Sequence, residues 1–321
     1  MTKTRVMRTV AILLSLAIAL ANFHPHSEVA GGVLFDSREM TVGPALLKPP
    51  AQPLLWRDPV DIKTRNLLAG IGGPDAAPNP THRFTFLSGS DPVSGEKVVQ
   101  DEAGRIWLLI TGLKARADVS ASRLLWAAGF HTDQTYYLPS IHIDGNGGGN
   151  FTEVRLKRRD DGYIKTASWS WSANPFVENR ELQGLRTLMA LLSVWDLSKK
   201  RNAIARRGEE TNFYVSQLQT ALGKSADLAS NSTVANPRHY AEQKFIDKVK
   251  DAKVFFHLKG DHTSVVRNVT VENARWIGEV LGQLSDQQIA DAFRAGGFSA
   301  SDIAVYQAAV KKRISDLRNL T

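Results

Sequence analysis

The feature that most constrains the fold is a change in the spacing of apolar residues, from strand-like to helical. The runs with β-like spacing are residues 84–86, 97–99, 106–111, 135–138, 140–143 and 152–157. From Arg180 onwards, apolar residues recur every three or four positions, as on one face of a helix. This order predicts an α+β fold with two lobes: a small antiparallel β-rich N-terminal lobe and a larger α-rich C-terminal lobe.

The helices are expected at positions given by periodicity and by capping residues. One helix at 118–128 should end at Gly129, and another should run from Arg180 to Val194. A short strand at 212–216 follows, and the last third is read as helices at 241–250, 270–281, 285–295 and 299–317. Ser285 and Gln288 have the spacing of a capping box, which predicts the start of the third of these helices.

The first 21 residues have the pattern of a secretory signal peptide. A basic start is followed by a short apolar run at 9–21 that ends in Ala19-Leu20-Ala21. We expect cleavage near Ala21 and a mature chain without a transmembrane segment, exported to the periplasm or the extracellular space; an uncleaved membrane anchor is the alternative. The remaining chain divides into a Pro-rich leader at 22–58, an N-terminal lobe at 59–149 and a C-terminal lobe at 150–321.

Composition excludes several classes of protein. None of the 321 residues is cysteine, which excludes disulfide scaffolds, zinc ribbons and thiol nucleophiles. The formal net charge of +8 is a modest excess. It is compatible with an anionic ligand or an envelope protein as partner, and it gives no reason to expect nucleic acid.

Three motifs have an ordinary structural reading beside a functional one. Gly70-Ile71-Gly72-Gly73 could approach a phosphate, but a plain loop is favoured because no helix clearly follows. His257 and His262 lack a third ligand at metal-site spacing, which favours a solvated turn. Trp169 and Trp171 would share one face of a strand, where core packing is favoured over a stacking platform.

The segment 180–223 contains the residues most suggestive of chemistry. Its helix ends in Trp195-Asp196, a loop brings in Asn202, and a strand leads to Gln217-Leu218-Gln219. Kinase-like phosphoryl transfer uses this order: a carboxylate, then an amide on the metal, then a metal-binding aspartate after a strand. From the spacing alone, an aspartate that only caps a loop is the favoured interpretation of Asp196.

At these residues the chain resembles a bacterial exported family of uncharacterised proteins with a kinase-like fold, distantly akin to HipA-type and secretory-pathway kinases. The resemblance extends over the chain after residue 21. The segments that carry it include Gly70–Gly73, Ser122–Gly129, Asn174–Phe176, Arg180–Arg186, Trp195–Leu197 and Ala274–Gly278.

The resemblance implies site residues, several of which are changed in this chain. The family's strand lysine position is occupied by Ile110, and its acidic partner by Asp118. The catalytic carboxylate matches Asp196, and of the family's two asparagine positions the first holds Arg201 and the second Asn202. The metal aspartate position holds Gln217, whose neutral amide is a poor ligand for Mg²⁺.

These changes predict a pseudoenzyme, that is, a kinase-like protein with degenerate catalytic motifs that binds a ligand or an envelope partner. Losing each electrostatic partner of a transferring phosphoryl group costs roughly 3–4 kcal/mol of transition-state stabilisation. No cofactor is then expected, whereas ATP and Mg²⁺ would be needed if the chain were active. One alternative is an active, atypical phosphotransferase that uses Asp196 as base, and another is a carbohydrate- or envelope-binding module that uses exposed tryptophans.

Overall fold

The computed structural model describes residues 52–89, 96–159, 162–225 and 232–321. The expected signal peptide at 1–21 and its cleavage site lie outside these residues, as does most of the leader. Among the residues described, no helix has both the length and the apolar character needed to cross a membrane. The chain has α+β content, with six α-helices in the described part and three sets of strands.

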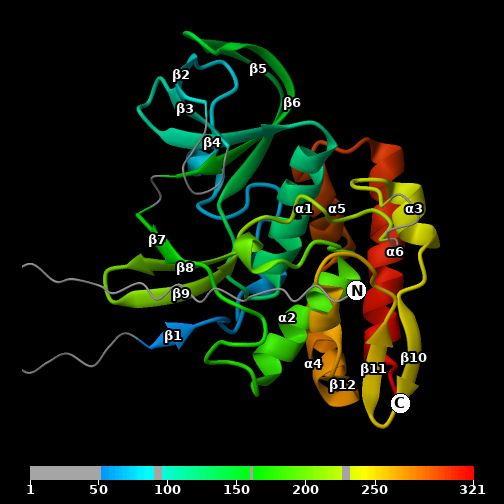
Figure 1. The fold of residues 1–321 in the computed structure, drawn as a ribbon. Coiled ribbons are helices and arrows are strands. Elements are labelled where there is room, and N and C mark those ends of the chain that lie inside the picture. The colour runs from blue at the N-terminus through cyan, green and yellow to red at the C-terminus, as the bar shows by residue number, and fades with distance from the viewer. Residues whose placement is uncertain (1–51, 90–95, 160–161, 226–231) are drawn as a thin grey trace, which may run out of the picture. The chain divides into compact units, whose positions relative to one another are not determined.

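A closed five-stranded barrel contains the early strands (Figure 1). Its strands, in the order in which they pair, are β2 Phe84–Ser88, β3 Lys97–Asp101, β4 Ile106–Thr111, β6 Gly149–Arg158 and β5 Thr135–Asp144. A short parallel pairing of β2 with β5 closes it, while all its other pairs are antiparallel. The expectation of an antiparallel sheet is therefore confirmed for β2, β3 and β4, and the sheet also includes β5 and β6.

Alternation along the barrel strands separates an apolar interior from a polar outer face. Trp107 and Leu109 of β4 pack inside with Val154 and Leu156 of β6. The residues between them on each strand point the other way, because successive side chains of a strand alternate. Since β6 belongs to the barrel, the barrel extends past the border expected between residues 149 and 150.

Helix α1, Leu113–Ala127, lies against the outer face of β4, β5 and β6. It begins five residues before the expected start at Asp118, so Asp118 lies inside the helix. Gly112, with φ +79°, precedes its first residue. Residues 113–117, LKARA, are good helix formers, which explains the earlier start. Gly129 follows the helix with φ +92°, as expected for a stop signal.

A second sheet has the order β1-β9-β8-β7, with β1 parallel to β9. The strands are β1 Pro53–Leu54, β7 Ile164–Ala167, β8 Asn202–Arg207 and β9 Glu210–Val215. The end of the expected leader is thus structured, and Leu55 is buried in the large core. Asn202, which was expected in a loop, is the first residue of β8.

The remaining helices contribute buried residues to one large apolar core. Helix α4 contacts α2 and α6, and α5 contacts α1 and α6. The helices are α2 Arg180–Leu191, α3 Pro237–Glu242, α4 Val271–Leu281, α5 Asp286–Ala295 and α6 Ala300–Arg318. The capping box of Ser285 and Gln288 is present at the start of α5, as expected.

The expectation of a helix at 241–250 is wrong. Only its start is helical, as the end of α3, and residues 246–250 form β10, Ile246–Lys250. This strand makes a hairpin with β11, Lys253–Phe256, which also pairs with β12, Val269–Thr270. The turn residues Asp251 and Ala252 both have positive φ, a conformation that glycine and asparagine usually signal. The second half is accordingly richer in strands than the sequence indicates.

Candidate functional site

A buried network of charged side chains lies between the barrel and α1. Arg155 and Lys157 are on β6, on the face opposite to the barrel interior. Arg155 Nε lies 2.9 Å from Asp118 Oδ2 of α1, and neither side chain has exposed surface. Arg155 also pairs with Glu96, whose other oxygen is 3.0 Å from Lys157 Nζ. Each buried charge thereby has an opposite charge beside it, as burial requires.

The network continues to Asp133 and to the strand β7. Lys157 Nζ lies 3.6 Å from Asp133 Oδ2, and Lys165 Nζ lies 2.9 Å from Asp133 Oδ1. Ser216 donates to Asp133 and accepts from Lys165 at 2.8 Å. Burial raises the pKa of Asp133, but the charges of Lys165 and Lys157 and the Ser216 hydroxyl outweigh it, so this pKa is lowered. Asp133 is therefore a stable anion.

The position of Ile110 can now be compared with its expected role. Ile110 lies directly opposite Arg155 in the register of β4 and β6. The cation beside Asp118 is therefore supplied by the neighbouring strand and not by β4. Burial lowers the pKa of Arg155, but Glu96 and Asp118 outweigh this and raise it, so Arg155 stays charged.

Asp118 connects this network to the segment around Gln217. Its Oδ1 accepts a hydrogen bond from the backbone N–H of Leu218 at 2.7 Å. The helix α1 therefore fixes the position of the residue that follows Gln217.

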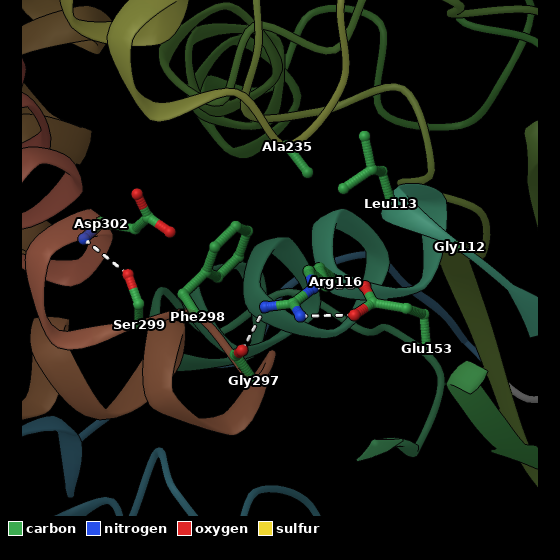
Figure 2. Close-up of a pocket in the computed structure, with 9 residues that line it drawn as sticks. All are labelled: Gly112, Leu113, Arg116, Glu153, Ala235, Gly297, Phe298, Ser299 and Asp302. Atoms are coloured by element: carbon green, nitrogen blue, oxygen red, sulfur yellow. Dashed lines mark hydrogen bonds and ion pairs between the residues drawn. The ribbon is translucent and has the colours of Figure 1, made fainter. Parts of the chain in front are cut away.

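Arg116 holds the start of α1 in place. Its guanidinium binds both carboxylate oxygens of Glu153 on β6 and the carbonyl of Gly297 after α5, and it lines a cavity of about 520 Å³ (Figure 2). Tyr137 Oη donates to the same carboxylate at 3.2 Å. Arg116 thus ties α1 to β6 and α5, two residues before Asp118.

A second group of polar residues, which we call the Arg201 clamp, comprises Asp196, Arg201 and Gln217. Arg201 places Nε and Nη2 each 2.8 Å from Asp196 Oδ2. Its Nη1 donates to Gln217 Oε1. One guanidinium thus binds both the expected base and the residue at the expected metal position.

Hydrogen bonds also set the acidity of Asp196. Burial raises the pKa of this carboxyl, but hydrogen bonds from Ser198 and Arg201 outweigh it and lower the pKa below its usual range. Ser198 N donates to Asp196 Oδ1 at 3.1 Å. A carboxylate with a lowered pKa and an occupied oxygen is a weak proton acceptor.

The residues present do not fit Mg²⁺. The amide oxygen of Gln217 and one oxygen of Asp196 already accept from Arg201, whose positive charge repels a cation. Asn202 donates to the carbonyl of Trp169 at 3.1 Å, and its Oδ1 is buried without a hydrogen-bond partner. Within the described residues, no three His, Asp or Glu side chains are grouped as metal ligands.

A pocket of about 520 Å³, which we call the cleft pocket, opens beside these residues. Asn202, Ser216 and Gln217 line it. Its basic lining residues are Lys157, Arg158, Arg159, Lys165 and Lys200. None of the described lining residues is acidic. Lys157 and Lys165 are paired with Asp133, whereas Lys200 is exposed and forms no ion pair within the described residues.

A smaller pocket of about 350 Å³ brings together Ile110, Glu96, Arg201 and Gln217. Gln217 lines both pockets. The geometry thus connects Ile110, Asn202, Gln217 and Asp196 through neighbouring cavities and the Arg201 clamp, with Asp118 buried beneath them.

The glycine, histidine and tryptophan motifs make ordinary packing and side-chain contacts in the structure. Trp169 and Trp171 are each 3% exposed, so core packing is confirmed. Of the other tryptophans, Trp107 is buried, and Trp56, Trp126, Trp195 and Trp276 are partly exposed. Gly70 packs on the guanidinium of Arg123, where a Cβ would clash. His257 is 2.9 Å from Asp247 Oδ1 in an ordinary side-chain pair.

Sequence reasoning missed the basic residues of the network and the cleft pocket. Arg155 and Lys157 alternate with Val154 and Leu156, which is the pattern of a strand with one polar face. That alternation could have indicated two cations on one face of β6. No sequence signal indicates that their partners are Glu96, Asp118 and Asp133.

Comparisons with known proteins leave the family open. No protein-family model matches the chain, and no curated protein matches it. Among solved structures, it is similar to the one described as a Helicobacter pylori proinflammatory kinase CtkA. The identity is 8% and the TM-score 0.39, over 70% of this chain and 88% of that one. A similarity at this TM-score assigns neither a family nor an activity.

Proposed function

We propose that this chain is an exported protein with a kinase-like fold that binds an anionic ligand in the cleft pocket and does not transfer phosphate. The observation that carries the proposal is the Arg201 clamp. Arg201 binds Asp196, the candidate base, and Gln217, at the candidate metal position. A phosphoryl transfer would need both groups free for substrate and metal.

The cleft pocket supports the binding part of the proposal. Lys165 is 31% exposed at its side chain and, like Lys200, lines this pocket. Lysines offer compact positive charges to phosphate oxygens. They make a divalent metal unnecessary for binding, although they do not replace it in catalysis.

A thermal-shift series with ATP tests this function most simply. We expect ATP to raise the unfolding temperature equally in the presence of EDTA, Mg²⁺ and Mn²⁺. A shift that requires a metal ion would instead support an active phosphotransferase with Asp196 as base. A shift with glycans alone would support the carbohydrate-binding alternative.

Repair of the clamp tests the pseudoenzyme part. The double variant Arg201→Asn/Gln217→Asp frees Asp196 and supplies a carboxylate that Mg²⁺ accepts. We expect this variant, if it remains folded, to gain metal-dependent ATP binding that the native chain lacks. The single variants should stay at the native level, because base and metal act on the same phosphate groups.

A further inference from the structure

A second basic pocket is lined in part by the residues that follow Asp196, Leu197 to Lys200. Its volume is about 740 Å³. A 3₁₀ turn at Lys199–Arg201 contributes Lys199 and Lys200. The other basic residues of the pocket are Arg186 of α2, His262, and Arg267 after the turn at 263–266. None of the described residues that line it is acidic. We call it the outer pocket.

Three cations of the outer pocket have no ion-pair partner among the described residues, and Arg186 has only the attraction of the Glu178 charge. Lys199, Lys200 and Arg267 are exposed and form no ion pair within the described residues. Arg186 is half-buried; its Nη2 donates to the carbonyl of Trp171 at 2.9 Å, and its Nε is buried without an acceptor. This differs from the buried network, in which each cation is beside a carboxylate.

The donors of the outer pocket suit one kind of anion. Besides the cations, its lining supplies hydroxyl groups of Ser170, Ser172, Ser198 and Ser264 and the amide of Asn268. A carboxylate has two oxygens, whereas a phosphate group presents three or four and can use more of these donors. Arginine and lysine together are typical of phosphate recognition.

We propose that the outer pocket is a phosphate-binding site, distinct from the cleft pocket, for a small ligand that carries at least one phosphate group. The two pockets share only Lys200. The outer site does not depend on the proposed function, because Lys165 and Ser216 line only the cleft pocket, and Arg186 and Arg267 only the outer one.

Calorimetric titration with pyrophosphate tests this site in the full chain. We expect the native chain to bind two pyrophosphate ions, one in each pocket. In the variant Lys199→Gln/Arg267→Gln the affinity of the outer pocket should fall by about tenfold or more, so that only the ion in the cleft pocket is detected. Both side chains are exposed, so the fold should be kept, as a thermal unfolding scan would verify. The variant Lys114→Gln/Arg238→Gln changes the net charge equally on residues outside both pockets and should still bind two.

Other probes identify the ligand chemistry and separate this site from the proposed function. Inorganic phosphate should compete at the outer pocket, and the dicarboxylate glutarate should not; equal competition by glutarate would overturn the phosphate assignment. The native chain could instead bind one pyrophosphate ion that is lost in Lys165→Gln and kept in Lys199→Gln/Arg267→Gln. This result would overturn the outer site and leave the cleft pocket standing. A single ion with the reverse pattern would contradict the cleft pocket and leave the outer site standing.

Discussion

The buried network and the Arg201 clamp are two groups of charged residues that differ in their exposure to solvent. The network places Asp118, Arg155 and Lys157 out of contact with water, and its charges are needed to neutralise one another. In the clamp, Arg201 retains 23% of its side-chain surface and lines the smaller pocket. The first group is therefore expected to determine stability, and the second to determine what the chain can do to a ligand.

The comparison also shows that Asp118 and Asp196 each have a structural contact and a cationic partner. Asp118 still orients α1 and the residue after Gln217, with Arg155 as its cation. Asp196 still caps the loop through Ser198, with Arg201 as its partner. Both carboxylates make a structural contact, and an arginine lies beside one oxygen of each.

The largest expected effect is on stability, from Asp118→Asn. This change leaves Arg155 buried with one carboxylate fewer and should lower the free energy of unfolding by about 3–5 kcal/mol. Urea unfolding, followed by tryptophan fluorescence, measures it. A loss below about 1 kcal/mol would mean that Glu96 alone satisfies Arg155.

A smaller loss is expected from Ile110→Lys. A lysine here would lie opposite Arg155 on the neighbouring strand, where a like charge is unfavourable. We expect it to reduce the free energy of unfolding by about 1–3 kcal/mol relative to the uncharged control Ile110→Met. A lysine variant as stable as the control would show that the network accepts another cation, and would revive Ile110 as the missing lysine position.

Acid should affect the network through Asp133. Its pKa is lowered in the folded chain, so its contribution to stability is present above the unfolded pKa of about 3.9 and is lost as the pH falls through the folded value. The variant Asp133→Asn should therefore lose less stability than the native chain below about pH 4. Identical slopes of unfolding free energy against pH would contradict the ion pairs with Lys165 and Lys157.

The smallest effect on stability is expected from Asp196→Asn, the matched change in the clamp. The asparagine keeps the oxygen that accepts from Ser198, and loses the charge and the oxygen that accept from Arg201, which is partly exposed and retains Gln217 as a partner. The cost should be about 1 kcal/mol, well below that of Asp118→Asn in the same urea experiment. Equal costs for both variants would remove the distinction between the two groups.

The same contrast shows what a sequence can reveal. Strand alternation and helical periodicity are local, and they located most barrel strands, α2, α4, α5 and α6. The hairpin at 246–256 was missed because Asp251 and Ala252 adopt positive φ without the usual residues. The strand β8 was missed because Arg206, Arg207 and the turn after them are polar.

For the candidate site, the sequence indicated positions but not partners. Asp196 and Gln217 are recognisable by their order along the chain, and Asp118 by the family resemblance. That Asp118 meets Arg155, and that Arg201 joins Asp196 to Gln217, depends on contacts between residues that the fold alone brings together. The roles of these residues in binding and catalysis remain predictions.

The most direct test of the central claim is the affinity of the native chain for ATP, measured by calorimetry with EDTA and then with Mg²⁺. If Arg201 takes the place of a metal and the lysines of the cleft pocket bind the phosphates, the two dissociation constants should agree within about twofold, which is about 0.4 kcal/mol. Lys165→Gln should weaken both equally. Binding that requires Mg²⁺, accompanied by phosphate transfer that Asp196→Asn abolishes, would contradict the account and identify an active phosphotransferase.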